Sequence, residues 1–248
     1  NAFTVNGKPL EIDVVFPALH GTYGEDGTIQ GLFEMADIPY VGCTHISSAI
    51  TMDKEKTKQI WENANLPVVP YICARKFEAE TEQGLSTLEE KSKNQFGYPV
   101  FIKPCCAGSS VGASKAANKE EFEKSVKEAF SWDDKILIEP FVKAREIECS
   151  VIGNEKQTSF VPCEILPTHE FYDYEAKYKD PDGAVFSIPA NLTEEQINKI
   201  LELASFEDRI GKKEITQSDI SEALIEIETE ISSYMMEEKK KYAREGDK

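Results

Sequence analysis

A lysine followed by a loop of small residues is the feature of this sequence that most directly suggests chemistry. The apolar run 98–103 ends in Lys103, and the loop that follows contains Ser109, Ser110 and Gly112. Glycines let backbone N–H groups approach an anion closely, and serine hydroxyls add further donors. The loop lacks the Gly-Lys-Ser/Thr ending of a Walker A motif. The segment predicts a phosphate site, with a plain turn after a strand as the alternative.

Acidic residues after a second apolar run could complete a nucleotide site. Glu139 ends the run 135–139, and Glu146 follows a short apolar linker. A carboxylate beside an apolar linker can accept hydrogen bonds from an adenine amine or a ribose hydroxyl. Exposed acids at a strand edge are the alternative reading.

Two other segments carry residue types that suit a site. Segment 171–178 contains four aromatic residues and Lys177. It is interpreted as a lid that brings Lys177 to a phosphate, with an aromatic surface clasp as the alternative. His20 ends a predicted strand before a glycine-rich turn, where ligands gather in open α/β sheets. A structural histidine is equally compatible with that position.

The elements that must position these residues fall into three predicted regions. In residues 1–66, strands and helices alternate, which is typical of an α/β layer. The predicted elements there are strands 11–19 and 38–42 and helices 28–35 and 47–65. Residues 67–204 predict an α+β region whose sheet is covered by helices on one side. Its predicted elements are strands 68–75, 98–103 and 135–139, helices 81–95 and 119–130, and an antiparallel pair, 146–152 and 160–165, joined by a Gly153-Asn154 turn.

The C-terminal part of the sequence predicts helices. Thr193 and Gln196 have the spacing of a capping box at a helix start. In the tail 205–248, apolar residues recur every three or four positions and predict one long helix over 218–244. Its apolar seam could pack on the body of the chain or on a second copy, which leaves a homodimer open.

Composition excludes several classes of function. The 248 residues include 45 acids and 28 bases, for a net charge of −17, which argues against a nucleic-acid binder. No apolar run approaches the ~20 residues of a membrane span, and no signal peptide is recognised, so a cytoplasmic protein without a membrane partner is predicted. The six cysteines have no metal-ligand spacing and are expected to be buried free thiols.

Four motifs occur in the order found in one enzyme family: His20–Gly31, Met52–Lys54, Lys103–Gly112 and Tyr172–Tyr178. Together they resemble the D-alanine–D-alanine ligase family of ATP-grasp enzymes, and the resemblance covers residues 12–203. It implies an ATP-grasp-type fold preceded by a partial Rossmann-like α/β layer.

The resemblance also implies a reaction. It is the ATP- and Mg²⁺-dependent joining of two D-alanines through an acylphosphate, for peptidoglycan precursor synthesis. The lid sequence 175–178 favours an amino acid over D-lactate as second substrate, and D-serine stays open. The alternative is a catalytically incomplete remnant that binds nucleotide weakly or serves as an association module.

Roles for individual residues follow from the motif match. Residues implied to bind the ATP phosphates are Lys54, Lys103, Ser110, Gly112 and, from the lid, Lys177. Residues implied to hold adenine and ribose are Glu139, the backbone of Phe141 and Val142, and Glu146. Ser109 and Tyr178 are implied to hydrogen-bond across the closed site and position substrate, with His20 near the first D-alanine.

Two parts of the family pattern have no counterpart in this sequence. One is an opening strand and glycine-rich loop with a substrate-binding glutamate. The other is a pair of strands carrying Arg-x-Asp and Glu-x-Asn, which bind Mg²⁺ and stabilise the intermediate. Asp208-Arg209 has the reverse order, and the acids of 214–230 fall on the predicted tail helix. The expectation is a ligase incomplete at both ends, with no metal ligands assigned.

Overall fold

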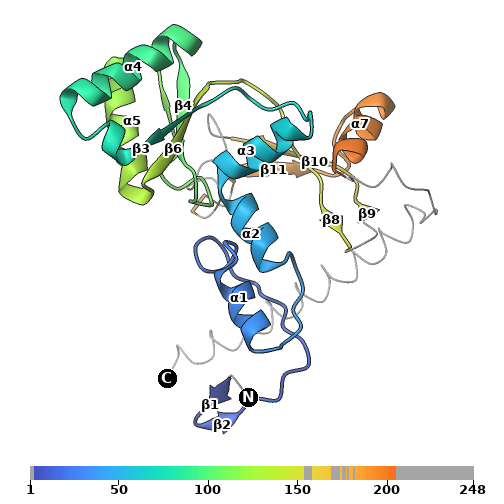
Figure 1. Ribbon diagram of the computed structural model, residues 1–248. Coiled ribbons are helices and arrows are strands. Elements are labelled where there is room, and N and C mark those ends of the chain that lie inside the picture. The colour runs from blue at the N-terminus through green and yellow to red at the C-terminus, as the bar shows by residue number, and fades with distance from the viewer. Residues whose placement is uncertain are drawn as a thin grey trace, which may run out of the picture. The chain divides into compact units, whose positions relative to one another are not determined.

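The computed structural model describes residues 3–153, 158–168, 174, 177, 179–180 and 182–204 (Figure 1). The chain divides into two compact units, one of residues 1–146 and 165–186 and the other of residues 147–164 and 187–248. The predicted tail helix 218–244 lies outside the described residues.

A four-stranded antiparallel sheet forms the centre of the first unit. Its strands are β3 (Ile72–Arg75), β4 (Val100–Pro104), β5 (Ser114–Ala116) and β6 (Lys135–Pro140), in the order β3-β6-β4-β5. Three of these strands coincide with the apolar runs in the sequence, so that prediction is confirmed. Ile102 pairs with Ile138, and Phe101 pairs with Glu139, which sets the two faces of the sheet.

One face of this sheet is the hydrophobic core. Because side chains alternate along a strand, Val100, Ile102, Ile136 and Ile138 share a face, and all four are fully buried. The helices α4 (Glu82–Phe96) and α5 (Lys119–Trp132) both cover that face (Figure 1). The predicted α+β region with helices on one side is confirmed. The opposite face, which we call the polar face, carries Lys103, Lys135 and Glu139 beside the apolar Phe101 and Leu137.

Local signals start the helices where the sequence predicts. The Thr81 hydroxyl accepts a hydrogen bond from the Gly84 N–H at 3.0 Å and caps α4. In the second unit, α7 (Glu194–Ala204) begins with the predicted capping box. The Gln196 N–H donates to the Thr193 hydroxyl at 3.3 Å, and the Thr193 N–H donates to the Gln196 side chain at 3.0 Å.

The predicted single helix 47–65 is instead two helices, α2 (His45–Met52) and α3 (Lys54–Asn63). The chain leaves the helical conformation at Asp53, where ψ is 99°. The Asp53 carboxylate then accepts hydrogen bonds from the Glu55 and Lys56 N–H groups at 3.0 and 3.2 Å, so it caps α3. The break makes Lys54 the first residue of α3.

The prediction of strands at 11–19 and 38–42 is wrong. Among the described residues they contribute one parallel bridge, between Val15 and Tyr40. Phe16 in the middle of the first run is 76% exposed, so the run has no layer to pack against.

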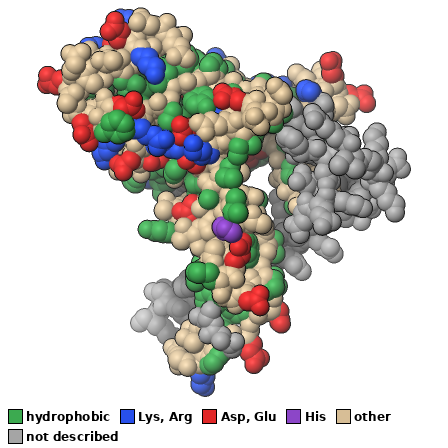
Figure 2. Space-filling view, in the orientation of Figure 1, with side chains coloured by type: hydrophobic (Ala, Val, Ile, Leu, Met, Phe, Trp, Pro, Cys, Tyr) green, Lys and Arg blue, Asp and Glu red, His purple; other side chains and the backbone are tan. Residues whose placement is uncertain are grey.

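The helix α1 (Thr28–Met35) forms as predicted, and apolar side chains are exposed over α1 and α2 (Figure 2). A short hairpin, β1 (Thr4–Val5) with β2 (Lys8–Pro9), precedes them.

The remaining strands are short. They are β7 (Glu146–Glu148), β8 (Val151–Ile152), β9 (Thr158–Ser159), β10 (Cys163–Pro167) and β11 (Ala184–Ser187). Strands β8 and β9 pair antiparallel, and a three-stranded sheet has the order β11-β10-β7. Strands β7 and β10 lie side by side as the sequence predicts, while β8 and β9 form a separate antiparallel pair. Residue 154 of the predicted turn lies outside the described residues.

Two whole-chain expectations can be compared with the structure. All six cysteines are free thiols, but only Cys105 is buried, and Cys43 and Cys106 are exposed. The expectation that the thiols are buried is therefore wrong for most of them, since Cys105 alone belongs to the buried hydrophobic residues. Among the described helices, none is long and apolar enough to cross a bilayer.

Candidate functional site

The polar face of the four-stranded sheet carries a buried carboxylate between two lysines. Lys103 on β4 lies two residues beyond Phe101, the partner of Glu139, so the Lys103 and Glu139 side chains share this face. The Lys103 Nζ lies 2.7 Å from one Glu139 oxygen, and the Lys58 Nζ lies 2.9 Å from the other. The Glu139 side chain is only 7% exposed. Two cations on one carboxylate leave net positive charge at the site.

Lys54 brings another positive charge to the end of β4. Its backbone N–H donates to the Cys105 carbonyl at 3.1 Å, and its Nζ donates to the Ala107 carbonyl at 2.7 Å. Burial and the nearby charge of Lys103 lower the pKa of Lys54 below its ordinary value. The two ammonium groups therefore lie close enough to repel each other. An anion bound between them would relieve that repulsion.

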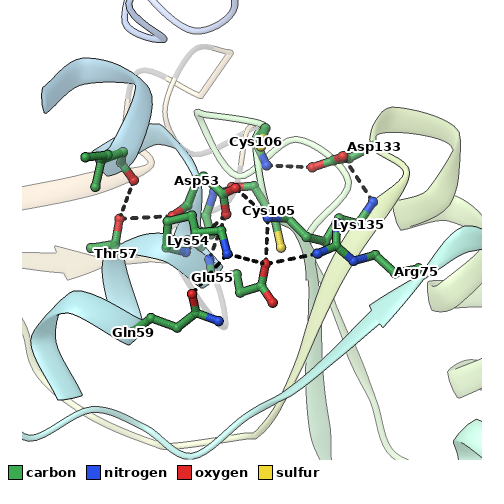
Figure 3. Close-up of polar contacts among 12 residues, drawn as sticks. Asp53, Lys54, Glu55, Thr57, Gln59, Arg75, Cys105, Cys106, Asp133 and Lys135 are labelled. Atoms are coloured by element: carbon green, nitrogen blue, oxygen red, sulfur yellow. Dashed lines mark hydrogen bonds and ion pairs between the residues drawn. The ribbon is translucent and has the colours of Figure 1, made fainter. Parts of the chain in front are cut away.

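A cluster of ion pairs holds the start of α3 on the sheet (Figure 3). Asp53, Glu55 and Lys135 point toward one another, and the Lys135 Nζ bonds to both carboxylates, at 2.8 Å for Glu55. Arg75 on β3 lies 3.4 Å from Glu55 as well. Because Asp53 and Glu55 flank Lys54 in sequence, this cluster fixes the position of Lys54.

Titration within the cluster follows from these contacts. Burial lowers the pKa of Lys135, but the hydrogen bonds to Asp53 and Glu55 outweigh it, and the pKa is raised overall. Burial raises the pKa of Glu55, but the hydrogen bonds from Lys135 and Cys73 outweigh it, and that pKa is lowered overall. Both groups are therefore held in their charged forms.

The loop of residues 105–112, which we call the glycine–serine loop, contains two tight turns in succession. The Val111 N–H donates to the Gly108 carbonyl at 3.0 Å, and the Ala113 N–H donates to the Ser110 carbonyl at 3.2 Å. Ser109 and Ser110 have φ values of 54° and 58°, which are uncommon for residues with a side chain. Residues with such uncommon backbone conformations are concentrated at binding sites.

The glycine–serine loop lies against the turn that follows His20. A Cβ atom added to Gly108 would come within 3.6 Å of the Gly21 Cα and 3.8 Å of a Glu25 oxygen. Glu25 also accepts a hydrogen bond from the Gly21 N–H at 2.6 Å, and His20 Nδ1 lies 3.9 Å from its other oxygen. The structure thus brings the loop of Ser109 and the turn of His20 together.

The residues after Glu139 form an apolar edge beside the lysines. The Phe141 N–H donates to the Pro99 carbonyl at 3.0 Å, and the Phe141 ring lies 6.4 Å from that of Phe101. The Lys115 Nζ lies 4.5 Å from the centroid of the Phe141 ring. Val142 is exposed and Glu146 is half-buried at the start of β7. The Phe141 N–H is therefore already used within the protein.

Part of the predicted site lies outside the described residues. Tyr178 and most of the predicted lid, 171–178, are not among the described residues. Lys177 is described and half-buried.

Sequence reasoning missed Lys58, Lys135 and the pair Asp53 and Glu55. The alternation of acids and lysines over 53–58 was the one local signal for Asp53, Glu55 and Lys58, and Lys135 had none.

A metal site is not formed by the residues that the structure describes. Among them, no group of three or more His, Cys, Asp or Glu side chains is arranged to hold a metal ion. The described side chains at this site that carry positive charge are the ammonium groups of Lys54, Lys58 and Lys103.

The antiparallel sheet with helices on one face belongs to an ATP-grasp-like fold, which solved D-Ala:D-Ser and D-alanine-D-alanine ligase structures share. The family model described as D-ala D-ala ligase C-terminus matches residues 60–220, and the one described as D-ala D-ala ligase N-terminus matches residues 1–43. The chain belongs to the D-alanine–D-alanine ligase family. The resemblance seen in the sequence is confirmed, and the matched segments extend beyond 12–203 on both sides.

Curated relatives and solved structures agree with this family. A D-alanine–D-alanine ligase of Treponema denticola is 53% identical over 195 residues, which are 79% of this chain and 53% of that protein. One from Oceanobacillus iheyensis is 46% identical over 78% of this chain and 52% of its own length. The chain therefore spans about half the length of these relatives.

Among solved structures, the VanG D-Ala:D-Ser ligase of Enterococcus faecalis matches with a TM-score of 0.68 and 35% identity, over 79% of this chain and 55% of that one. The D-alanine-D-alanine ligase of Coxiella burnetii matches with a TM-score of 0.63 and 34% identity, over 77% of this chain and 49% of that one.

Proposed function

We propose that the polar face of the sheet binds the phosphates of ATP. The observation that carries this proposal is the convergence of Lys54 and Lys103 beside the glycine–serine loop, where the charge of one lowers the pKa of the other. Lysines are common phosphate ligands, and closely placed backbone donors complement them. Ser110 and Gly112 supply further donors in this arrangement, and Lys177 approaches from the lid.

The rest of the nucleotide would lie along the apolar edge of the site. In this proposal Glu139 and the backbone of Phe141 and Val142 hold the adenine, and Glu146 holds the ribose. We further propose residues 67–204 as the nucleotide-binding region, residues 1–66 as the substrate side and 205–248 as a helical tail, divergent beyond residue 220, where the family match ends.

The reaction proposed is the ATP-dependent joining of two D-alanines. The carboxylate of one D-alanine takes the terminal phosphoryl group, with release of ADP. The amine of the second attacks that carbonyl carbon, and phosphate leaves as the amide forms. The physical obstacle is repulsion between the carboxylate and the phosphates, which clustered cations reduce. In this scheme Ser109, Tyr178 and His20 position the amino acids.

The family also implies Mg²⁺, but the described residues offer no group of three acids to hold it. We therefore assign no step of the reaction to a metal.

D-Serine is a second candidate for the attacking amino acid. The similarity to the structure of a D-Ala:D-Ser ligase, at a TM-score of 0.68, is the observation that favours D-serine as this second candidate. The remaining alternative is a remnant that binds nucleotide without ligation.

Calorimetric titration with ATP and an ADP-release assay test the proposal together. ATP binding, with ADP release that depends on D-alanine and not on L-alanine, supports the ligase. Greater release with D-alanine plus D-serine supports the second candidate. Binding without release supports the remnant, and the lack of any ATP binding contradicts the proposed site.

The lowered pKa of Lys54 predicts how ATP affinity depends on pH. The free ammonium loses its proton below the ordinary lysine value of about 10.4, and a bound phosphate would favour the proton. ATP affinity should therefore fall as the pH rises toward about 10.4, beginning at a lower pH than for an ordinary lysine. Lys54→Arg keeps its charge over that range, so its profile should be flatter. Titrations at several pH values check this, and parallel profiles would count against a role for Lys54.

Gly112 should tolerate no side chain in the glycine–serine loop. Its φ is +67°, and an added Cβ would lie 2.6 Å from Trp132 Cδ1 and 3.0 Å from Pro104 Cγ. Gly112→Ala is expected to shift the loop and weaken ATP binding by about 10-fold, as misplacement of one or two donors does. Gly31→Ala is the control, because no atom lies within 4 Å of its added Cβ. Calorimetry should find the control unchanged.

A further inference from the structure

Lys58 shares the buried carboxylate of Glu139 with Lys103, and the proposed function gives it no role. Its Nζ lies 2.9 Å from Glu139, donates to the Val69 carbonyl at 2.8 Å, and lies 5.2 Å from the centroid of the Tyr71 ring. The side chain is 10% exposed. These three contacts hold the ammonium group in place.

Lys103 is the more accessible partner of the same carboxylate. Its side chain is 23% exposed, and it lies on β4 just before the glycine–serine loop. Of the two lysines, Lys103 is the one that can turn toward a phosphate. If it does so, a carboxylate that is 7% exposed loses one of its two cations. A buried carboxylate with no cation at all would be strongly destabilised.

We propose that Lys58 is a positioning residue for phosphate binding, because it remains the counter-ion of Glu139 and thereby allows Lys103 to leave. This inference rests on the proposed function. With Lys58 present, moving Lys103 from Glu139 to a phosphate exchanges one ion pair for another. Without Lys58, Glu139 retains Lys103, and the phosphate must compete with a buried carboxylate for the same ammonium group.

Inorganic tripolyphosphate is the probe, because it contains the phosphates and no base for Glu139 to contact. Lys58→Met is expected to weaken its binding by about 10-fold, the effect of losing one charge-assisted contact. Glu139→Gln in the same chain removes the competing charge, so the double variant should recover to within about threefold of the unmodified protein. Lys58→Arg, which keeps a cation, should bind nearly normally.

Each result has a definite meaning. A purely structural role for Lys58 would weaken binding without recovery by Glu139→Gln, and that outcome overturns the inference. If Lys58→Met does not fold, the double variant still decides, because it leaves no buried carboxylate without a cation: binding far below normal overturns the inference. Lys103→Met reports separately on the proposed function. If it binds tripolyphosphate normally, the phosphate site itself is wrong.

Discussion

Replacement of Lys103 by methionine should reduce the affinity for ATP by about 100-fold, the upper range for losing a hydrogen bond from a charged group. The Nζ of Lys103 lies 2.7 Å from Glu139 and beside the glycine–serine loop. Methionine has a similar length and no charge, so it removes the phosphate contact and little packing. Glu139 keeps Lys58 as its cation, so the fold should persist. Isothermal titration with ATP gives the measurement.

A lysine on the opposite side of the sheet provides the matched control. Lys119 begins α5, which covers the apolar face, and its side chain is 55% exposed. Lys119→Met makes the same change in net charge, so any difference between the variants reports the position of the charge. Equal losses in both variants would mean that net charge alone governs ATP binding, and the polar face would no longer be the candidate.

Replacement of Lys135 by methionine should lower the free energy of unfolding by about 3–5 kcal/mol, the usual cost of breaking a buried ion pair. Lys135 bonds to Asp53 and to Glu55, and its side chain is 8% exposed. Without it, two carboxylates beside the start of α3 lose their common cation. Urea denaturation followed by circular dichroism measures the change.

A surface pair shows what the same substitution costs without burial. Lys76 lies 3.4 Å from Asp134, and both side chains are half or more exposed. Exposed pairs contribute about 0–1 kcal/mol, so Lys76→Met should change stability little. Comparable effects of the two substitutions would show that the cluster around Lys135 does not stabilise the fold.

The pKa shifts in the cluster predict a pH window for this effect. The pKa of Glu55 is lowered, so its stabilisation is present above its unfolded value of about 4.3 and is lost as the pH falls through the folded value. The pKa of Lys135 is raised, so its stabilisation is present below about 10.4 and is lost as the pH rises through the folded value. The difference between the unmodified protein and Lys135→Met should therefore be largest near neutral pH and shrink in strong acid.

Elements with local start signals and a core-facing stripe could be predicted from the sequence. Helix α4 begins after Thr81, and α5 carries Phe122 and Val126 on its buried side. The run 11–19 has the same apolar character as β4 but does not form a strand, because a strand also needs a partner along its length. Only one bridge, at Val15, is available among the described residues.

The candidate site was predictable only in part. The glycine–serine loop and Lys103 stand out by composition, and the family motifs add Lys54 and Glu139. Neither composition nor a family motif singles out Lys58 or Lys135, because their partners lie about 80 positions away in sequence. An ion pair across that separation leaves no periodic pattern, so only the folded chain reveals it.

The amino-acid sequence by itself determined the family, the central strands and the chemistry available to an anion. These features depend on residue type and on short spacing along the chain, so they can be recognised before the fold is known. The tertiary structure alone decided that helix 47–65 breaks at Asp53, that Lys58 and Lys103 meet at Glu139, and that Lys54 lies near Lys103. These outcomes depend on charges being removed from water together, and that happens only when distant segments pack.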